Sequence, residues 1–352
     1  MVDSELTGRR RQVLQAVPDD YIRTAEPVGS RVVAKRHHLG LSPATIRNTM
    51  ADLEELGYLS QPHTSAGRVP TDRAYRFYVD SLREGSHDHR PRSAPHFFPS
   101  SEVGSLMAET SHHLSVSSRL TGVVLAPPLK TTILERLELI PLEGNRILAV
   151  IITESGWLTT KVLSVEPSLT QAALCEFSRL LTDRFGGKTF EAIQQWVNKA
   201  TQGPEDPDPL VRQAEALAQQ VLAAVGERNL YLGGILNILD QPEFSDVQAM
   251  KALLRTLEAK GELVNLLTLH AESPGVQVLI GRENPFEALQ DFSLVTSTYS
   301  AGDRVLGILG VVGPRRMPYA EIVSLVEETA ELMSQWLRRV TEAERARVRV
   351  SP

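Results

Sequence analysis

Residues 41–58 read LSPATIRNTMADLEELGY, and their pattern indicates how the first part of the chain folds. Ser42 is a residue type that caps helix N-termini, and Pro43 suits the first helical position, where its missing N–H costs nothing. Apolar residues then recur at helical spacing: Ile46, Met50, Leu53 and Leu56. The stretch therefore predicts an amphipathic helix that starts sharply after Ser42 and ends near residue 56.

Upstream of this helix, the sequence predicts a second, shorter helix and a turn. The segment EPVGSR, residues 26–31, breaks the chain, and Ser30 can cap a helix. The buried side of that helix is expected to carry Val32, Val33 and Ala34. Residues 39–41, Leu-Gly-Leu, form a compact turn, and two short helices joined in this way are typical of a helix-turn-helix unit. A helix over residues 5–25 comes first, and Pro18 could kink it.

Downstream, residues 61–71 read QPHTSAGRVPT. With the apolar residues at 58–59 before it, this segment predicts a strand, a polar turn and a second strand, which is a wing with Arg68 near its tip. A helix over residues 71–82 follows. The sequence therefore predicts a winged helix-turn-helix domain over residues 1–85.

In a helix-turn-helix the first turns of the second helix enter the major groove. Thr45, Arg47 and Asn48 lie on those turns, away from the apolar stripe; arginine can pair with guanine and asparagine with adenine. Neighbouring polar and basic residues suit phosphate contacts that set the register. The candidate DNA contacts are Arg31, Lys35, Ser42, Thr45, Arg47, Asn48, His63, Thr64 and Arg68.

The charge distribution of the first 85 residues fits a surface that faces phosphates. This part holds 12 Lys and Arg against 11 Asp and Glu, a net of +1, whereas the whole chain carries −6. Residues 27–51 contain four basic residues and no acid, and residues 56–71 contain His63 and Arg68 and no acid. Helix-turn-helix units also serve as protein-interaction modules, so pattern and charge alone leave that alternative open.

The segments 26–31, 41–58 and 61–71 together resemble the HrcA family of bacterial heat-inducible transcription repressors. The resemblance implies a homodimer that binds an inverted-repeat operator ahead of chaperone operons and blocks transcription. It also implies modulation by the GroE chaperonin, which helps such repressors reach the DNA-binding form.

Beyond the first domain, periodicity predicts an α+β multidomain protein. Helices are expected over residues 102–120, 169–185, 189–200, 209–229, 246–260, 261–270 and 319–340, and strands over 121–127, 133–140, 146–153, 157–165, 276–281, 292–299 and 304–312. The family resemblance continues in QPEFSD (241–246), IGRENP (280–285) and GILGVVGP (307–314). It implies a GAF-like domain, residues 101–130 and 229–340, interrupted by an inserted dimerisation domain at 131–228. Residues 86–100, rich in Pro, Ser and His, are expected to be a linker.

No catalytic constellation stands out in the sequence. It has no phosphate-binding glycine-lysine motif, no Gly-x-Ser-x-Gly and no His-Glu-x-x-His, so we expect no enzyme and no cofactor. The histidines at 87, 89 and 96 lack acids or cysteines at ligand spacing, so we expect no metal site. The single cysteine, Cys175, is expected to be a small buried residue on a helix.

The sequence also bears on location and control. No apolar run is long enough to span a bilayer and no secretion signal is apparent, so we expect a cytoplasmic protein without a membrane partner. A repressor controlled by a small ligand in the GAF-like domain remains an alternative to control by the chaperonin.

Overall fold

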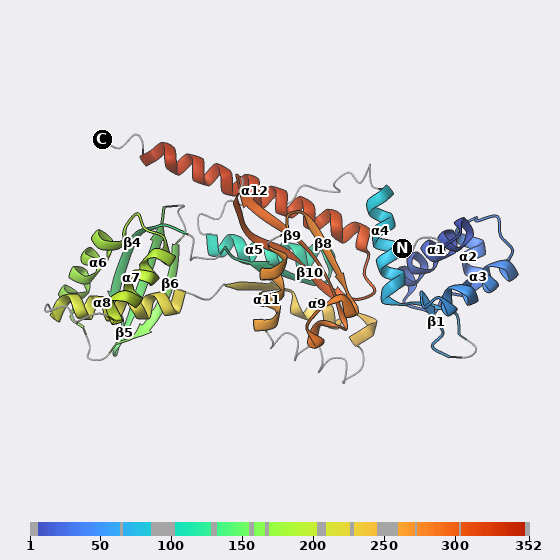
Figure 1. The fold of residues 1–352 in the computed structure, drawn as a ribbon, viewed down its shortest axis with the longest axis horizontal. Helices are drawn as coiled ribbons and strands as arrows, with labels where there is room; N and C mark the ends of the chain where they lie inside the picture. The colour runs from blue at the N-terminus through green and yellow to red at the C-terminus, as the bar shows by residue number, and fades with distance from the viewer. Residues whose placement is uncertain are drawn as a thin grey trace.

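The computed structural model of the chain forms three parts in a row, with a winged helix at one end, a central sheet and an inserted domain at the other end (Figure 1). The structure describes residues 6–63, 66–85, 103–127, 132–154, 158–165, 169–202, 209–225, 229–244, 260–271, 273–302 and 304–348. The expected linker at 86–100, with its three histidines, and the expected helix at 246–260, except residue 260, lie outside the described residues.

The winged helix has the predicted order of elements. They are α1 (Gly8–Thr24), α2 (Ser30–Arg36), α3 (Pro43–Glu55), β1 (Leu59–Ser60), β2 (Val69–Pro70) and α4 (Asp72–Gly85). Helix α1 runs through the buried Pro18 without interruption, and Gly40 takes a positive φ of 68° in the turn before α3. Apolar residues of α1, α2 and α3 form one core, as the helical periodicity predicted.

A five-stranded antiparallel sheet forms the central domain, in the order β7-β3-β10-β9-β8. The strands are β3 (Thr121–Leu125), β7 (Leu230–Gly233), β8 (Val276–Ile280), β9 (Phe292–Ala301) and β10 (Arg304–Pro314). Helices α5 (Val103–Ser118) and α12 (Tyr319–Val348) pack into one core, and α9 (Ile235–Leu239) and α11 (Lys260–His270) into a second. Short 3-10 turns lie at Pro242–Phe244, Gly281–Glu283 and Glu287–Leu289.

Strand β7 and helix α9 are the central elements that the sequence did not predict. Strand β7 has only four residues and ends in a glycine pair, so it shows no strand-length alternation. Its place comes from pairing with β3, which lies before the inserted domain: Leu125 pairs with Leu230, and the N–H of Ala126 donates to the carbonyl of Asn229 at 3.0 Å. The chain therefore leaves and re-enters the central sheet at adjacent points.

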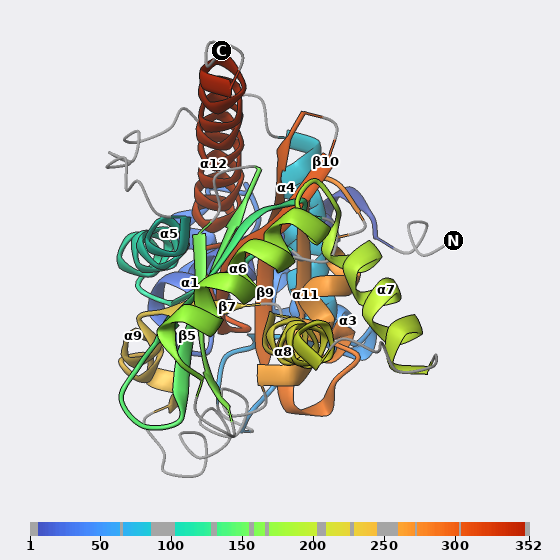
Figure 2. The same cartoon turned by 90° about the vertical axis from the view of Figure 1, so that its left-hand side faces the viewer.

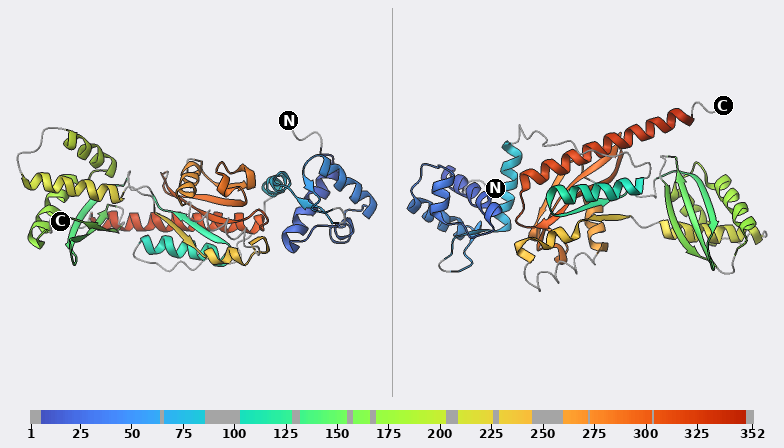
Figure 3. Two further views of the ribbon diagram at one scale, coloured as in Figure 1. Left: turned by 90° about the horizontal axis from the view of Figure 1, so that it is seen from below. Right: turned by 180° about the vertical axis from the view of Figure 1, so that it is seen from behind.

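Between these two points lies the inserted domain, which faces the viewer in Figure 2. Its sheet has the order β4-β5-β6, made of β4 (Leu134–Pro141), β5 (Arg146–Thr153) and β6 (Leu158–Ser164). Its helices are α6 (Gln171–Phe185), α7 (Phe190–Gln202) and α8 (Pro209–Val225). The helices cover one face of the sheet and form a core of their own with it (Figure 3).

The expectation that Cys175 is buried is wrong, because the residue is exposed on α6. Helix α6 buries Leu174, Phe177 and Leu181 against the sheet. Since consecutive helical residues are turned by about 100°, the residue after Leu174 points away from that stripe.

Candidate nucleic-acid interface

The start of α3 is capped as the sequence predicted. The Ser42 hydroxyl accepts a hydrogen bond from the backbone N–H of Thr45 at 3.1 Å, and Pro43 occupies the first turn. The Ser42 and Thr45 hydroxyls also lie 2.8 Å apart and share a hydrogen bond. This capping fixes where α3 begins, and with it the direction in which its first side chains point.

The two faces of α3 are sharply divided. Ile46 and Leu53 are fully buried and Met50 is 3% exposed, so this stripe packs into the domain core. Arg47 and Asn48 are exposed. The predicted reading surface is therefore free of the core, and its arginine and asparagine can approach a base edge without disturbing the packing.

Helix α2 presents Arg31 and Lys35 to solvent, as phosphate contacts require. Its buried side is narrower than expected: Val33 is fully buried and Ala34 half-buried, but Val32 is 40% exposed. Three consecutive residues span about 200° of a helix, so they cannot all face one core.

Acidic residues that the sequence analysis did not single out organise the domain. Asp20 of α1 is 1% exposed; it accepts a hydrogen bond from Arg36 at 2.9 Å and lies 3.2 Å from Nε2 of His37. Asp52 of α3 pairs with Arg10 of α1 at 3.1 Å. These pairs tie α1 to both helices of the helix-turn-helix. The acid-free segments 27–51 and 56–71 did not predict these ion pairs, because Asp20 and Asp52 lie outside both segments.

The wing departs from the prediction at Arg68. His63 is exposed in the loop after β1, and Thr64 lies outside the described residues. The expectation that Arg68 lies near the tip is wrong: it forms an isolated backbone bridge with Val28, and its guanidinium pairs with Glu54 of α3 at 2.8 Å. The Arg68 side chain is 18% exposed, and its guanidinium is already paired with the Glu54 carboxylate instead of being available to a phosphate.

Helix α4 joins the winged helix to the central domain. Tyr75 and Val79 are buried in the same core as β8, β10 and α12. Arg76 donates from Nε to one oxygen of Glu283 at 2.7 Å and from Nη2 to the other, and Nη2 also donates to the carbonyl of Val278 at 2.6 Å. The hydrogen bonds to Glu283 raise the pKa of the Arg76 guanidinium. The DNA-binding unit therefore shares packing and a charged contact with the sheet.

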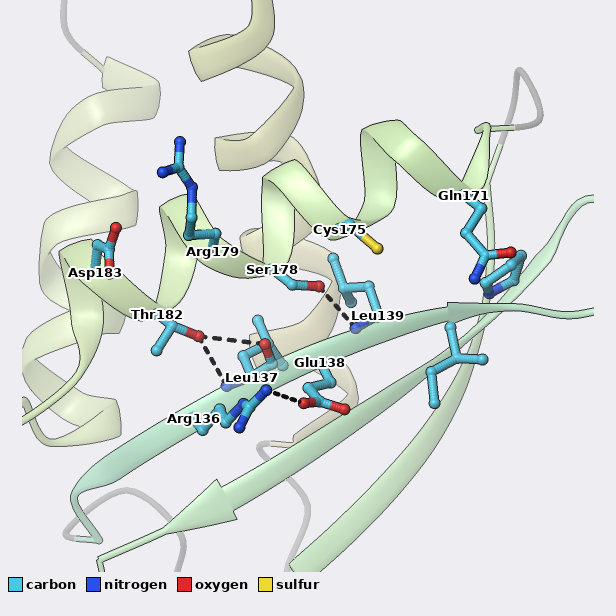
Figure 4. Close-up of a pocket in the computed structure, with 12 residues that line it drawn as sticks. Arg136, Leu137, Glu138, Leu139, Gln171, Cys175, Ser178, Arg179, Thr182 and Asp183 are labelled. Carbon is cyan, nitrogen blue, oxygen red and sulfur yellow. Dashed lines mark hydrogen bonds and ion pairs between the residues drawn. The ribbon is translucent and has the colours of Figure 1, made fainter. Parts of the chain in front are cut away.

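A groove on the surface bears on the small-ligand alternative. It lies in the inserted domain between α6 and the edge strand β4, with Cys175 and Arg179 on its wall (Figure 4). Two of its polar side chains form hydrogen bonds with the backbone of the edge strand: Thr182 bonds the N–H and the carbonyl of Leu137, and Ser178 accepts from the N–H of Leu139 at 2.9 Å. The small-ligand alternative predicts a ligand site in the central domain, whereas this groove lies in the inserted domain.

Two further features are absent from the described part of the chain. Within it, no group of three or more His, Cys, Asp and Glu residues is placed to hold a metal ion. None of its helices combines the length and apolar composition that a membrane crossing requires.

Comparison with known proteins matches two long stretches of the chain to one family. Residues 5–81 match the winged helix-turn-helix transcription repressor, HrcA DNA-binding domain, and residues 104–323 match the HrcA protein C terminal domain. The heat-inducible transcription repressor HrcA of Geobacter sulfurreducens is 40% identical over 95% of this chain and 99% of its own length. The repressor of the same name from Symbiobacterium thermophilum is 38% identical over 95% and 99%.

A solved structure supports the fold. The crystal structure of a hypothetical protein, at 2.2 Å resolution, superposes with a TM-score of 0.67 and covers 95% of this chain and 99% of that one. The two sequences are 23% identical, so this likeness concerns the fold alone.

Proposed function

The chain belongs to the HrcA family of heat-inducible transcription repressors, and on that premise we propose that it represses chaperone operons as a homodimer on an inverted-repeat operator. One observation carries the proposal: a capped α3 buries Ile46 and exposes Arg47 and Asn48. Those two side chains would read bases, while Arg31 and Lys35 would hold phosphates. Ser42, Thr45, His63 and Thr64 complete the proposed contact surface. The proposed location is the cytoplasm, where the operator is.

The outer face of the inserted sheet supports a dimer. Ile140, Leu148 and Val162 form one row across the three strands on the side away from the helices. Ile140 is 42% and Val162 is 56% exposed. An exposed apolar row on a sheet face is typical of a surface that a second copy covers. We assign dimerisation to residues 131–228 on this basis.

Symmetry then sets the form of the operator. A two-fold dimer presents two copies of α3, related by its axis, so each meets one half-site of a palindrome. Occupancy of such a site blocks transcription of the operon behind it. On the strength of the family resemblance, we expect that site ahead of chaperone genes.

Control by heat follows from the fraction of folded dimer. The apparent affinity for the operator falls in proportion to the population that is competent to bind. The GroE chaperonin would raise this population, and heat would lower it as unfolded proteins occupy the chaperonin. Repression would therefore be relieved when chaperones are needed.

The test is an equilibrium titration of the full chain against inverted-repeat DNA and scrambled DNA at fixed salt, with and without chaperonin. Preference for the repeat that increases with chaperonin is the expected result. Preference that is indifferent to chaperonin would favour control by a small ligand. Equal binding to both DNAs would refute the proposed operator recognition.

A further inference from the structure

An antiparallel backbone bridge between Val28 and Arg68 holds the wing to the rest of the domain; we call this bridge the crossing. The N–H of Val28 donates to the carbonyl of Arg68 at 2.8 Å, and the N–H of Arg68 donates back to the carbonyl of Val28 at 2.9 Å. Val28 lies two residues before the start of α2, and Arg68 lies directly before β2. The base of the wing is thus tied to the start of the helix-turn-helix by a pair of backbone hydrogen bonds.

Gly67 makes this crossing possible. A Cβ at this position would lie 2.5 Å from the carbonyl carbon and oxygen of Val28 and 2.7 Å from the carbonyl carbon of Pro27. These neighbours are backbone atoms, which cannot swing aside as a flexible side chain would. The close approach therefore requires glycine before Arg68.

The Arg68 side chain extends the crossing to α3. Its Nη2 lies 2.8 Å from Oε2 of Glu54, and the two side chains are 18% and 34% exposed. Glu54 follows Arg47 by seven residues, about two helical turns, so both lie on nearly the same side of α3. The ion pair therefore connects the base of the wing to the stripe that carries the proposed reading residue.

We propose that Glu54 and Arg68 are positioning residues that set the angle of the wing to α3, and that Arg68 does not itself contact DNA. The inference rests on the proposed function and refines it by removing Arg68 from the contact surface. The wing carries His63 in its loop, so its angle decides whether the loop reaches the DNA while Arg47 and Asn48 lie against the bases. The ion pair also neutralises Glu54, whose carboxylate would otherwise repel nearby phosphates.

The decisive variant is Glu54→Ala, because two explanations predict opposite signs. Removing a carboxylate beside a DNA-facing stripe strengthens DNA binding if only charge matters. If Glu54 positions the wing, the same variant weakens operator binding, by about tenfold for the loss of a charge-assisted contact. Binding equal to or tighter than that of the unmodified protein would overturn the proposal.

A charge swap separates positioning from phosphate contact. Arg68→Ala should weaken operator binding about as much as Glu54→Ala, and the double variant with Glu54→Arg and Arg68→Glu should return to within about threefold of the unmodified protein. If Arg68 instead contacts a phosphate, Arg68→Ala should reduce the salt slope of binding by about 1, and the swap should stay weak. Arg23→Ala is the matched control, since Arg23 pairs with Asp19 on α1 at 3.1 Å. It should leave operator binding unchanged.

A second measurement needs no operator. Amide hydrogen exchange at Val28 and Arg68 should quicken in both single variants and return in the swap, while exchange in α1 stays unchanged. Unchanged exchange at these two amides would refute the positioning role even if operator recognition itself failed. A failure of the unmodified protein to prefer the repeat would concern the proposed function alone.

Discussion

Arg47 and Asn48 are the two adjacent residues to which we assign the reading of bases. Both are exposed, and the residues on either side of them, Ile46 and Thr49, are buried. The pair can therefore change without loss of core packing. This separation between contact and core makes the reading role testable by truncation.

Arg47→Ala and Asn48→Ala should each weaken binding to the inverted repeat by about 1–3 kcal/mol, because each would remove a proposed bidentate base contact. Binding to scrambled DNA should change little. Parallel titrations on the two DNAs measure both effects, and unchanged thermal unfolding would verify the fold. An equal loss on both DNAs would mean that these residues touch phosphate only.

For the residues of α3, helical periodicity predicted exposure correctly, but it did not predict which side chains form ion pairs. The 3.6-residue period placed Ile46 in the core and Arg47 outside it, as observed. It could not place Arg68, because the carboxylate that holds it belongs to Glu54, fourteen residues earlier on another element. Ion pairs between elements depend on tertiary packing, which local periodicity does not encode.

Among the elements, α3 depends most directly on one side chain at its start. Ser42→Ala removes the acceptor for the Thr45 N–H and should lower the free energy of unfolding by about 0.5–2 kcal/mol. Ser42→Asn keeps an N-cap acceptor and should therefore retain most of the free energy of unfolding that the alanine variant loses. Chemical denaturation followed by circular dichroism measures both variants. Equal stability of the alanine variant and the unmodified protein would show that the cap contributes nothing.

We propose that a second protomer covers the outer face of the inserted sheet. Val162→Lys places a charge on its open face and should dissociate the proposed dimer, raising the dissociation constant at least about tenfold, because burying an unpaired ammonium group is costly. Sedimentation equilibrium measures the change. Gln195→Lys on α7, exposed on the helical side, is the control and should leave association intact. A dimer that survives Val162→Lys would exclude this face.

Contacts between segments that are far apart in the sequence were the feature of the fold that the sequence predicted least well. The sequence showed strands, helices and breaks in nearly the observed order, and the terminal helix α12 is longer than expected. It could not show that Leu125 and Leu230 pair across the entire inserted domain. Nor did it show that Tyr75 of the winged helix belongs to the core of the central domain.

That shared core predicts that the winged helix and the central domain unfold together. Arg76→Met keeps the apolar stem of the side chain but removes the hydrogen bonds to Glu283 and to the Val278 carbonyl. The loss of a charge-assisted pair that is about two-thirds buried should destabilise the junction by about 1.5–3 kcal/mol. Amide exchange should then quicken in α3 relative to β9 and β10, whereas in the unmodified protein these elements should exchange with similar free energies.

Arg184→Ala is the matched control for this experiment. Arg184 stacks over Trp196 with 4.1 Å between its guanidinium carbon and the ring centroid, so it is also a partly buried arginine, but it lies in the inserted domain. Its loss should leave exchange in α3 unchanged. If Arg76→Met behaves in the same way, the two units are not coupled through α4. If instead α3 loosens while the central sheet keeps its protection, heat can release the DNA-binding unit before the rest of the chain unfolds.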